Sequence, residues 1–167
     1  MSIHFNADEV FQMAEQIERN GSKFYRRAAE RAGESQTAQL FLRLAEMEDE
    51  HEKIFVRMRS QLSDEERKAL VPDPQDQSAA YLQAWADGHV FNVRANVEEF
   101  LKGKETIEDT FQLAIGLEKD SIVFYLGMKD AVPERLGRSR IDAIIREEMQ
   151  HIASLSRQLQ TLRHQLL

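Results

Sequence analysis

The sequence predicts an all-α protein, a four-helix bundle of two helical hairpins joined by a long crossover that contains short helices. Apolar residues recur at spacings of three and four along most of the chain. They form four segments that are much longer than the usual helix of about 12 residues. Only 3 Pro and 7 Gly occur among 167 residues, too few for a chain of many tight turns. The length fits a single domain over residues 1–167.

The first two segments predict one helical hairpin. Asn6, followed three residues later by Glu9, is typical of a capping box at the start of a helix. This helix continues to about Ala32, where Gly33 provides a stop. The second segment then runs to about Leu62.

The last two segments predict a second hairpin. The third helix begins near Thr106, and Asp109 completes its cap pattern. Pro133 interrupts the helical pattern, so that Val132 and Pro133 belong to a short loop. The fourth helix, from about Leu136, continues close to the C-terminus.

Residues 63–104 form the predicted crossover between the hairpins. The segment opens with Ser63-Asp-Glu-Glu-Arg-Lys68, which is typical of a capped, exposed helix start. Short helical patterns follow around Ser78–Ala86 and Asn96–Lys102. A connection of this length allows the second and third long helices to run roughly parallel.

Composition excludes several classes of function. Lys and Arg total 22 and Asp and Glu total 29, which gives a net charge of −7. We therefore expect no nucleic-acid partner, because an acidic surface binds phosphates poorly. The absence of Cys excludes disulfides, thiolate metal sites and a cysteine nucleophile. No apolar run reaches the ~18 residues that span a bilayer and the N-terminus lacks a signal pattern, so we expect no membrane partner and a cytoplasmic location.

The two hairpins repeat one another at an offset of 100 positions. The repeat unit is a pair of long helices, which predicts a bundle with approximate two-fold symmetry. The matched pairs are Phe11 and Phe111, Ala14 and Ala114, Glu18 and Glu118, Phe24-Tyr25 and Phe124-Tyr125, Glu48 and Glu148, and His51 and His151.

The spacing of the four repeated glutamates predicts that they lie at one height. Glu18 and Glu48 are 30 positions apart (48 − 18), and so are Glu118 and Glu148 (148 − 118). The midpoint of each pair falls on the predicted loop of its hairpin. Fifteen residues of helix rise about 22 Å, so each glutamate lies near the middle of the bundle.

Four carboxylates on apolar helix faces would repel one another unless cations hold them together. Two divalent ions would balance their charge. Each Glu-x-x-His pair places both side chains on one helix face, and this doubled pattern is typical of dinuclear carboxylate sites. Carboxylate and imidazole favour iron or manganese, and zinc also fits. The predicted ligands are Glu18, Glu48, His51, Glu118, Glu148 and His151.

Other interpretations of these residues remain open from the sequence. Arginines close in sequence could pair with the glutamates instead: Arg43, Arg57, Arg140 and Arg146. Tyr25 and Tyr125 could be plain core aromatics. His89 in the crossover could be an extra ligand, although a solvated or hydrogen-bonded histidine is the commoner case. His4 and His164 lie near the termini, where we expect them to be solvated.

At these motifs the sequence resembles the rubrerythrin and ferritin-like family of di-iron proteins. The resemblance rests on Glu18–Tyr25, Glu48-Asp-Glu-His51, Glu118–Tyr125 and Glu148-Met-Gln-His151. It implies a ferritin-like bundle that binds two iron ions. By this resemblance Glu18 and Glu118 would be terminal ligands, Glu48 and Glu148 would bridge the metals, and His51 and His151 would each bind one metal. Tyr25 and Tyr125 would then hydrogen-bond to ligand carboxylates and orient them.

Two features depart from the family pattern. Rubrerythrins usually carry an extra glutamate one turn after the third-helix ligand, whereas this chain has Ser121. The ligand set is therefore closer to the symmetric six-ligand site of bacterioferritin-like ferroxidase centres. Rubrerythrins also often carry a Cys-rich rubredoxin domain, and this chain has no Cys. We expect an external electron donor, such as a rubredoxin-like protein.

The sequence therefore predicts a non-haem di-iron oxidoreductase that reduces peroxide or oxygen. The alternative is a ferroxidase-like protein that binds, stores or senses iron without catalytic turnover. A third interpretation, a metal-free helical interaction module, predicts that Glu18→Ala and Glu118→Ala would stabilise the fold. We also expect a homodimer, because four-helix units often associate.

Overall fold

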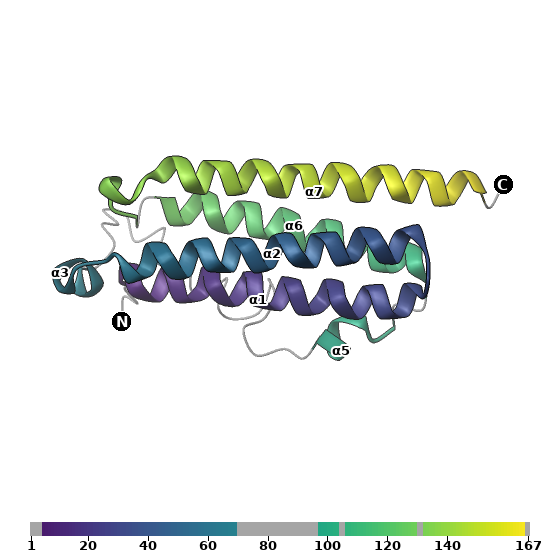
Figure 1. Ribbon diagram of the computed structural model, residues 1–167, viewed down its shortest axis with the longest axis horizontal. Coiled ribbons are helices and arrows are strands. Elements are labelled where there is room, and N and C mark those ends of the chain that lie inside the picture. Colours follow the sequence, from purple (N-terminus) through teal and green to yellow (C-terminus); the bar gives the residue numbers. More distant parts are fainter. Residues whose placement is uncertain (1–4, 70–96, 104–105, 130–131, 166–167) are drawn as a thin grey trace.

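The computed structural model describes residues 5–69, 97–103, 106–129 and 132–165, and they form two helical hairpins packed side by side (Figure 1). The predicted all-α bundle of four long helices is confirmed. The long helices are α1 (Ala7–Ala32), α2 (Gln36–Ser60), α6 (Ile107–Met128) and α7 (Arg138–Gln165). Within the described ranges three short elements accompany them: α3 (Asp64–Lys68), α5 (Val97–Leu101) and the 3-10 helix η2 (Glu134–Leu136).

The predicted helix starts are confirmed at both hairpins. The Asn6 side chain accepts a hydrogen bond of 2.9 Å from the backbone N–H of Glu9, whose carboxylate accepts one from the backbone N–H of Asn6. Thr106 and Asp109 form the same capping box at α6. At the other end of α1, Gly33 has φ 67°, which is unfavourable for residues with a Cβ.

The start of the fourth helix differs from the prediction. Leu136 lies in η2 and not in the long helix, which begins at Arg138. Gly137 has φ 81° and separates the two elements. Leu136 is nevertheless buried. Its apolar side chain continues the periodic pattern although the backbone leaves the helix. The apolar spacing therefore gave no sign that the long helix begins only after Leu136.

The crossover is described at its two ends. Ser63 caps α3 through a capping box with Glu66, as predicted, and α5 lies within the predicted patch 96–102. The predicted helical patch at 78–86 and His89 lie outside the described residues.

Two contacts show that the two described ends of the crossover lie at opposite ends of the bundle. Arg135, beside the turn between α6 and α7, donates a hydrogen bond of 2.7 Å to the carbonyl of Gln61 at the end of α2. Arg31 at the end of α1 donates one of 3.3 Å to the carbonyl of Leu101 in α5. The helices α2 and α6 therefore run in the same direction, as predicted (Figure 1).

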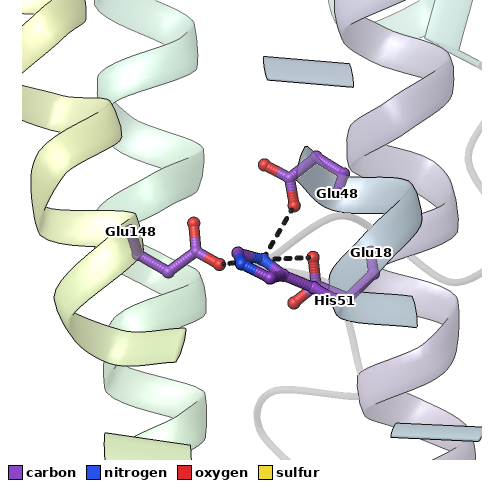
Figure 2. A group of neighbouring side chains, drawn as sticks. All are labelled: Glu18, Glu48, His51 and Glu148. Atoms are coloured by element: carbon purple, nitrogen blue, oxygen red, sulfur yellow. Dashed lines mark ion pairs between the residues drawn. The ribbon is translucent and has the colours of Figure 1, made fainter. Parts of the chain in front are cut away.

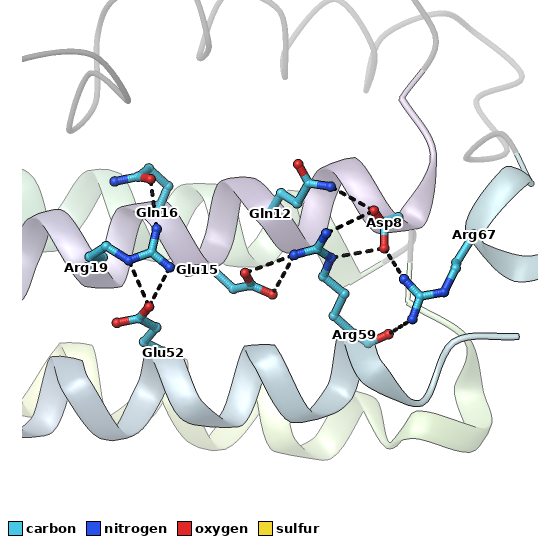
Figure 3. A network of polar contacts seen from close by, with 8 residues as sticks. All are labelled: Asp8, Gln12, Glu15, Gln16, Arg19, Glu52, Arg59 and Arg67. Carbon is cyan, nitrogen blue, oxygen red and sulfur yellow. Dashed lines mark hydrogen bonds and ion pairs between the residues drawn. The ribbon is translucent and has the colours of Figure 1, made fainter. Parts of the chain in front are cut away.

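A row of ion pairs joins α1 to α2 along one side of the first hairpin (Figure 3). Arg59 lies 3.0 Å from Asp8 and 3.1 Å from Glu15. Further along, Arg19 contacts Glu52 at 2.6 Å. Glu15 is buried, so its carboxylate depends on Arg59 for compensation.

Buried aromatic rings form a triplet on each side of the mid-bundle layer. The ring centroids of neighbours within the triplets are 5.0 to 6.5 Å apart. These rings exclude water from the layer between them and lower its polarity. One triplet is Phe11, Phe55 and Tyr125, and the other is Tyr25, Phe41 and Phe111. None of the described helices combines the length and the apolar character needed to cross a membrane.

Candidate metal centre

Each of the four long helices contributes one buried glutamate to the middle of the bundle. The exposed fractions are 1% for Glu18, 5% for Glu48, 3% for Glu118 and 1% for Glu148. His51 and His151 are buried beside them. The structure therefore brings together all six residues that the sequence predicted as ligands.

The first group of potential ligands surrounds the His51 ring (Figure 2). The Nδ1 atom of His51 lies 3.0 Å from Glu148 Oε1, 3.5 Å from Glu18 Oε2 and 3.9 Å from Glu48 Oε2. One potential ligand atom from each of the four residues lies within 4.8 Å of all the others. These four side chains come from three helices, α1, α2 and α7.

The second group surrounds the His151 ring in the same way. Its Nδ1 atom lies 3.0 Å from Glu148 Oε2, 3.3 Å from Glu118 Oε1 and 3.5 Å from Glu48 Oε1. Glu48 and Glu148 thus belong to both groups, and each presents one carboxylate oxygen to each histidine. The two imidazole rings are nearly parallel, with centroids 5.8 Å apart. This arrangement is the one expected of two carboxylates that bridge a pair of metal ions.

Two buried tyrosines connect the hairpins at this layer. The Tyr25 hydroxyl on α1 donates a hydrogen bond to Glu118 on α6. The Tyr125 hydroxyl on α6 donates one to Glu18 on α1. Each hairpin therefore orients the unshared glutamate of the other hairpin. Burial raises the pKa of both tyrosines well above the ordinary value, so both hydroxyls stay protonated donors.

The remaining polar atoms of the layer fit a pair of cations. Glu18 Oε2, both carboxylate oxygens of Glu148 and Nδ1 of both histidines are buried and find no hydrogen-bond partner within the described ranges. Buried polar atoms are nearly always satisfied, and these face one another across the same small space. Carboxylate oxygens and imidazole nitrogens together suit iron, manganese or zinc. The group thus fits a dinuclear metal site.

Pairing with arginine does not account for the four buried glutamates of this layer. The arginines considered from the sequence are all exposed: Arg43, Arg57, Arg140 and Arg146.

Without cations, protons must compensate the glutamates. Burial, together with the nearby charge of Glu48, raises the pKa of Glu18 well above the ordinary value of 4.5. Burial and the neighbouring Glu148 raise the pKa of Glu118 to about 8. Glu118 therefore retains its proton at neutral pH in the metal-free protein, and Glu18 loses its proton less readily than an exposed glutamate.

The histidines respond to the same charges. Burial lowers the pKa of His51, but its contacts with Glu148 and Glu18 outweigh burial and raise the value to about 12. The pKa of His151 rises above its usual range for the same reason, through Glu118 and Glu148. Burial and Glu48 act to raise the pKa of Glu148, but its contacts with Glu118 and both histidines lower it overall. Metal ions must displace the protons that these groups hold.

The sequence did not reveal two residues beside the centre. Glu147, partly exposed on α7, lies with its Oε2 2.8 Å from Nε2 of His51. Gly21 on α1 gives room to Glu48, because a Cβ at this position would lie 3.3 Å from the Glu48 carboxylate carbon. The sequence signal for both was a difference between the two repeats. Met47 occupies the position that corresponds to Glu147, and Ser121 occupies the position that corresponds to Gly21.

Ser121 is buried, and its hydroxyl donates a hydrogen bond of 3.1 Å to the backbone carbonyl of Leu117. His164 is exposed, as predicted, whereas His4 lies outside the described residues.

Comparison with known proteins agrees with this geometry. The family described as rubrerythrin matches residues 9–159 of the chain. Among solved structures, a ferritin-like diiron-carboxylate protein from Thermotoga maritima is similar, with a TM-score of 0.75 and 25% sequence identity. The alignment covers 96% of this chain and 98% of that one. No curated protein sequence gives a significant match. With its ferritin-like fold and buried Glu/His centre, the chain belongs to the rubrerythrin family.

Proposed function

We propose that the chain binds two iron ions at this centre and is a non-haem di-iron oxidoreductase that reduces peroxide or oxygen. The observation that carries the proposal is the sharing of Glu48 and Glu148. Each of these carboxylates directs one oxygen toward His51 and the other toward His151. Two iron ions held by these residues would together supply two electrons to one oxidant molecule.

The chain contributes spacing, orientation and protection from water. The ligand set is Glu18 and His51 at one position, Glu118 and His151 at the other, and the two shared glutamates between them. The tyrosine hydroxyls hold the unshared glutamates in place, because each donates to one of them. The aromatic triplets keep the surroundings apolar, which strengthens charge interactions at the centre.

The alternative is a ferroxidase-type protein that takes Fe(II) as its substrate and binds, stores or senses iron. One observation favours it. Position 121 holds a serine that hydrogen-bonds to its own helix, so it adds no carboxylate to the centre. The six ligands are then matched one to one between the hairpins.

Electrons for repeated turnover come, under this proposal, from a separate donor such as a rubredoxin-like protein, since the chain contains no Cys. We further propose that the protein acts as a homodimer. A reductant-coupled peroxidase assay and a mass measurement of the assembly test these two points.

The test of the central proposal is stopped-flow mixing of peroxide with protein loaded anaerobically with Fe(II). We expect oxidation faster than that of free Fe(II). Glu48→Gln should abolish the acceleration, because it removes a shared charged ligand. Glu50→Gln is the matched control, since Glu50 is exposed two residues away on the same helix. Oxidation no faster than in free solution would refute the proposal.

Two further measurements separate the alternatives. Sustained peroxide consumption with an added reductant supports the oxidoreductase. A single round of oxidation by a large shell-like assembly supports storage. Elemental analysis of protein purified without added metal identifies iron, manganese or zinc.

A further inference from the structure

The two histidines of the centre differ in what they contact on the side away from the glutamates. Nε2 of His51 lies 2.8 Å from the Glu147 carboxylate. Nε2 of His151 is buried and has no hydrogen-bond partner among the described residues. Both rings direct Nδ1 toward the shared glutamates, and the outward contact of Nε2 distinguishes them.

The internal repeat explains this difference. Glu147 immediately precedes the shared ligand Glu148 on α7 and reaches across to His51 on α2. The matching residue on α2, which precedes Glu48, is Met47. A thioether is at most a weak acceptor and carries no charge. Both residues are partly buried at matched positions. The two sides of the centre therefore differ at this position, with a carboxylate on one side and a thioether on the other.

From this asymmetry we infer that Glu147 is a positioning residue that makes the two metal positions unequal. The position formed by Glu18 and His51 binds a divalent cation more tightly than the position formed by Glu118 and His151, and it fills first. This inference rests on the proposed dinuclear site and adds an order of filling to it.

The physical reason is the effect of a carboxylate on a ligating imidazole. A carboxylate that accepts the Nε2 proton fixes the tautomer, so that Nδ1 carries the lone pair for the metal. It also fixes the orientation of the ring and increases the basicity of Nδ1. Loss of such a partner typically weakens metal binding about 10- to 100-fold. In the part of the chain that the structure describes, no carboxylate accepts from Nε2 of His151, so its ring is less well prepared to bind.

The test uses Co(II) alone, added to the metal-free full-length protein at one equivalent. Anomalous diffraction then measures the occupancy of each position, and calorimetric titration measures the two affinities. In the wild type we expect Co(II) mainly at the position of Glu18 and His51, with affinities that differ about 10- to 100-fold. Equal occupancy of the two positions would overturn the inference.

Substitutions at Glu147 and Met47 locate the cause. Glu147→Leu should lower the affinity of the first position and remove the preference. Glu147→Gln should fall between the wild type and Glu147→Leu, because its amide oxygen still accepts the proton without the charge. Met47→Glu should raise the affinity of the second position, and Met47→Gln replaces it if the charge prevents folding. Glu46→Leu, an exposed site beside Met47, is the control and should retain the wild-type preference.

The outcomes also separate this inference from the proposed function. A wild type that binds two equivalents of Co(II), with an occupancy preference unaffected by Glu147→Leu, leaves the dinuclear site standing and refutes the role of Glu147. A wild type that binds no Co(II) at the six ligands refutes the dinuclear site itself, and the order of filling with it.

Discussion

The α1–α2 and α6–α7 hairpins carry the same ligand pattern but differ in the residues that surround it. Glu, Glu and His occur at matched positions in both. Beside them, Gly21 corresponds to Ser121 and Met47 corresponds to Glu147. The comparison shows that the ligand positions are identical in the two hairpins, and removing one member of a buried group of charges is strongly destabilising. The residues that surround the ligands differ between the hairpins, and they make the two halves of the centre chemically distinct.

The outer contacts of the hairpins differ as well. Arg59 links α1 to α2 through partly buried pairs, and its side chain is 29% exposed. In the second hairpin Arg163 pairs with Glu108 where its side chain is 50% exposed. Water screens the second pair more strongly. The Arg163 pair is thus weaker than the Arg59 pairs, whereas Lys129, which pairs with Asp142 in the second hairpin, is as sheltered as Arg59.

The largest expected effect comes from removing a shared ligand in either hairpin. Glu48→Gln and Glu148→Gln should each lose both metal ions, because each side chain serves both positions. Glu18→Gln and Glu118→Gln should each weaken mainly one position. Elemental analysis after anaerobic loading measures the bound metal per chain. Equal losses in all four variants would show that the glutamates are not divided into shared and unshared ligands.

The stability of the metal-free protein should fall as the pH rises from about 5 to about 8.5. Burial raises the pKa of Glu118 to about 8. Burial lowers the pKa of His51, but the contacts of His51 with Glu148 and Glu18 outweigh burial and raise its pKa to about 12. A raised folded-state pKa contributes stability that is fully present below the unfolded-state value and is lost as the pH rises through the folded-state value. The pKa of Glu148 is lowered, so its contribution changes only in more acidic solution.

Metal binding should reverse this slope, because bound cations replace the protons and bind more tightly as the pH rises. Urea unfolding with chelator and with excess Mn(II) measures both slopes. Glu118→Gln should flatten the metal-free slope. A metal-free stability that rises over this interval would contradict the charge state described here.

Substitution by alanine at the matched positions 21 and 121 should affect the two hairpins unequally. In Gly21→Ala the new Cβ would lie 3.3 Å from the Glu48 carboxylate carbon. With metal bound, Glu48 is held on both sides and cannot move away, so we expect a loss of about 1–3 kcal/mol. Without metal, Glu48 can shift, and the better helix propensity of alanine should add up to about 1 kcal/mol.

Ser121→Ala is the matched substitution in the second hairpin. It removes only a hydrogen bond to the Leu117 carbonyl, so its effect on metal binding should be small. Unfolding with and without metal compares the two variants. A similar response of both would show that Gly21 is not needed to accommodate Glu48.

The smallest expected effects concern the outer ion pairs. Arg59→Ala leaves the buried Glu15 without its partner and should cost about 1–2 kcal/mol. Arg163→Ala removes an exposed pair and should cost about 0.5 kcal/mol or less. Urea unfolding of both variants in the same metal state provides the comparison. A larger loss for Arg163→Ala would contradict the proposed difference between the hairpins.

Much of the fold was predictable because it is encoded locally. Helix caps at Asn6 and Thr106 depend on residues three positions apart, and helix faces depend on spacings of three and four. The 3-10 helix around Leu136 was missed because a buried side chain there preserves the apolar rhythm while the backbone turns.

The sequence alone determined the four helices, their pairing into hairpins and the single height of the four glutamates, because helix geometry converts spacing along the chain into position along an axis. Only the tertiary structure decided which oxygen of Glu48 and Glu148 faces which histidine, that Tyr25 and Tyr125 bond across the hairpins, and that Glu147 contacts His51. Those relations depend on how separate helices rotate and approach one another. Packing of the whole core sets that rotation, and the spacing of residues along a single helix does not reveal it.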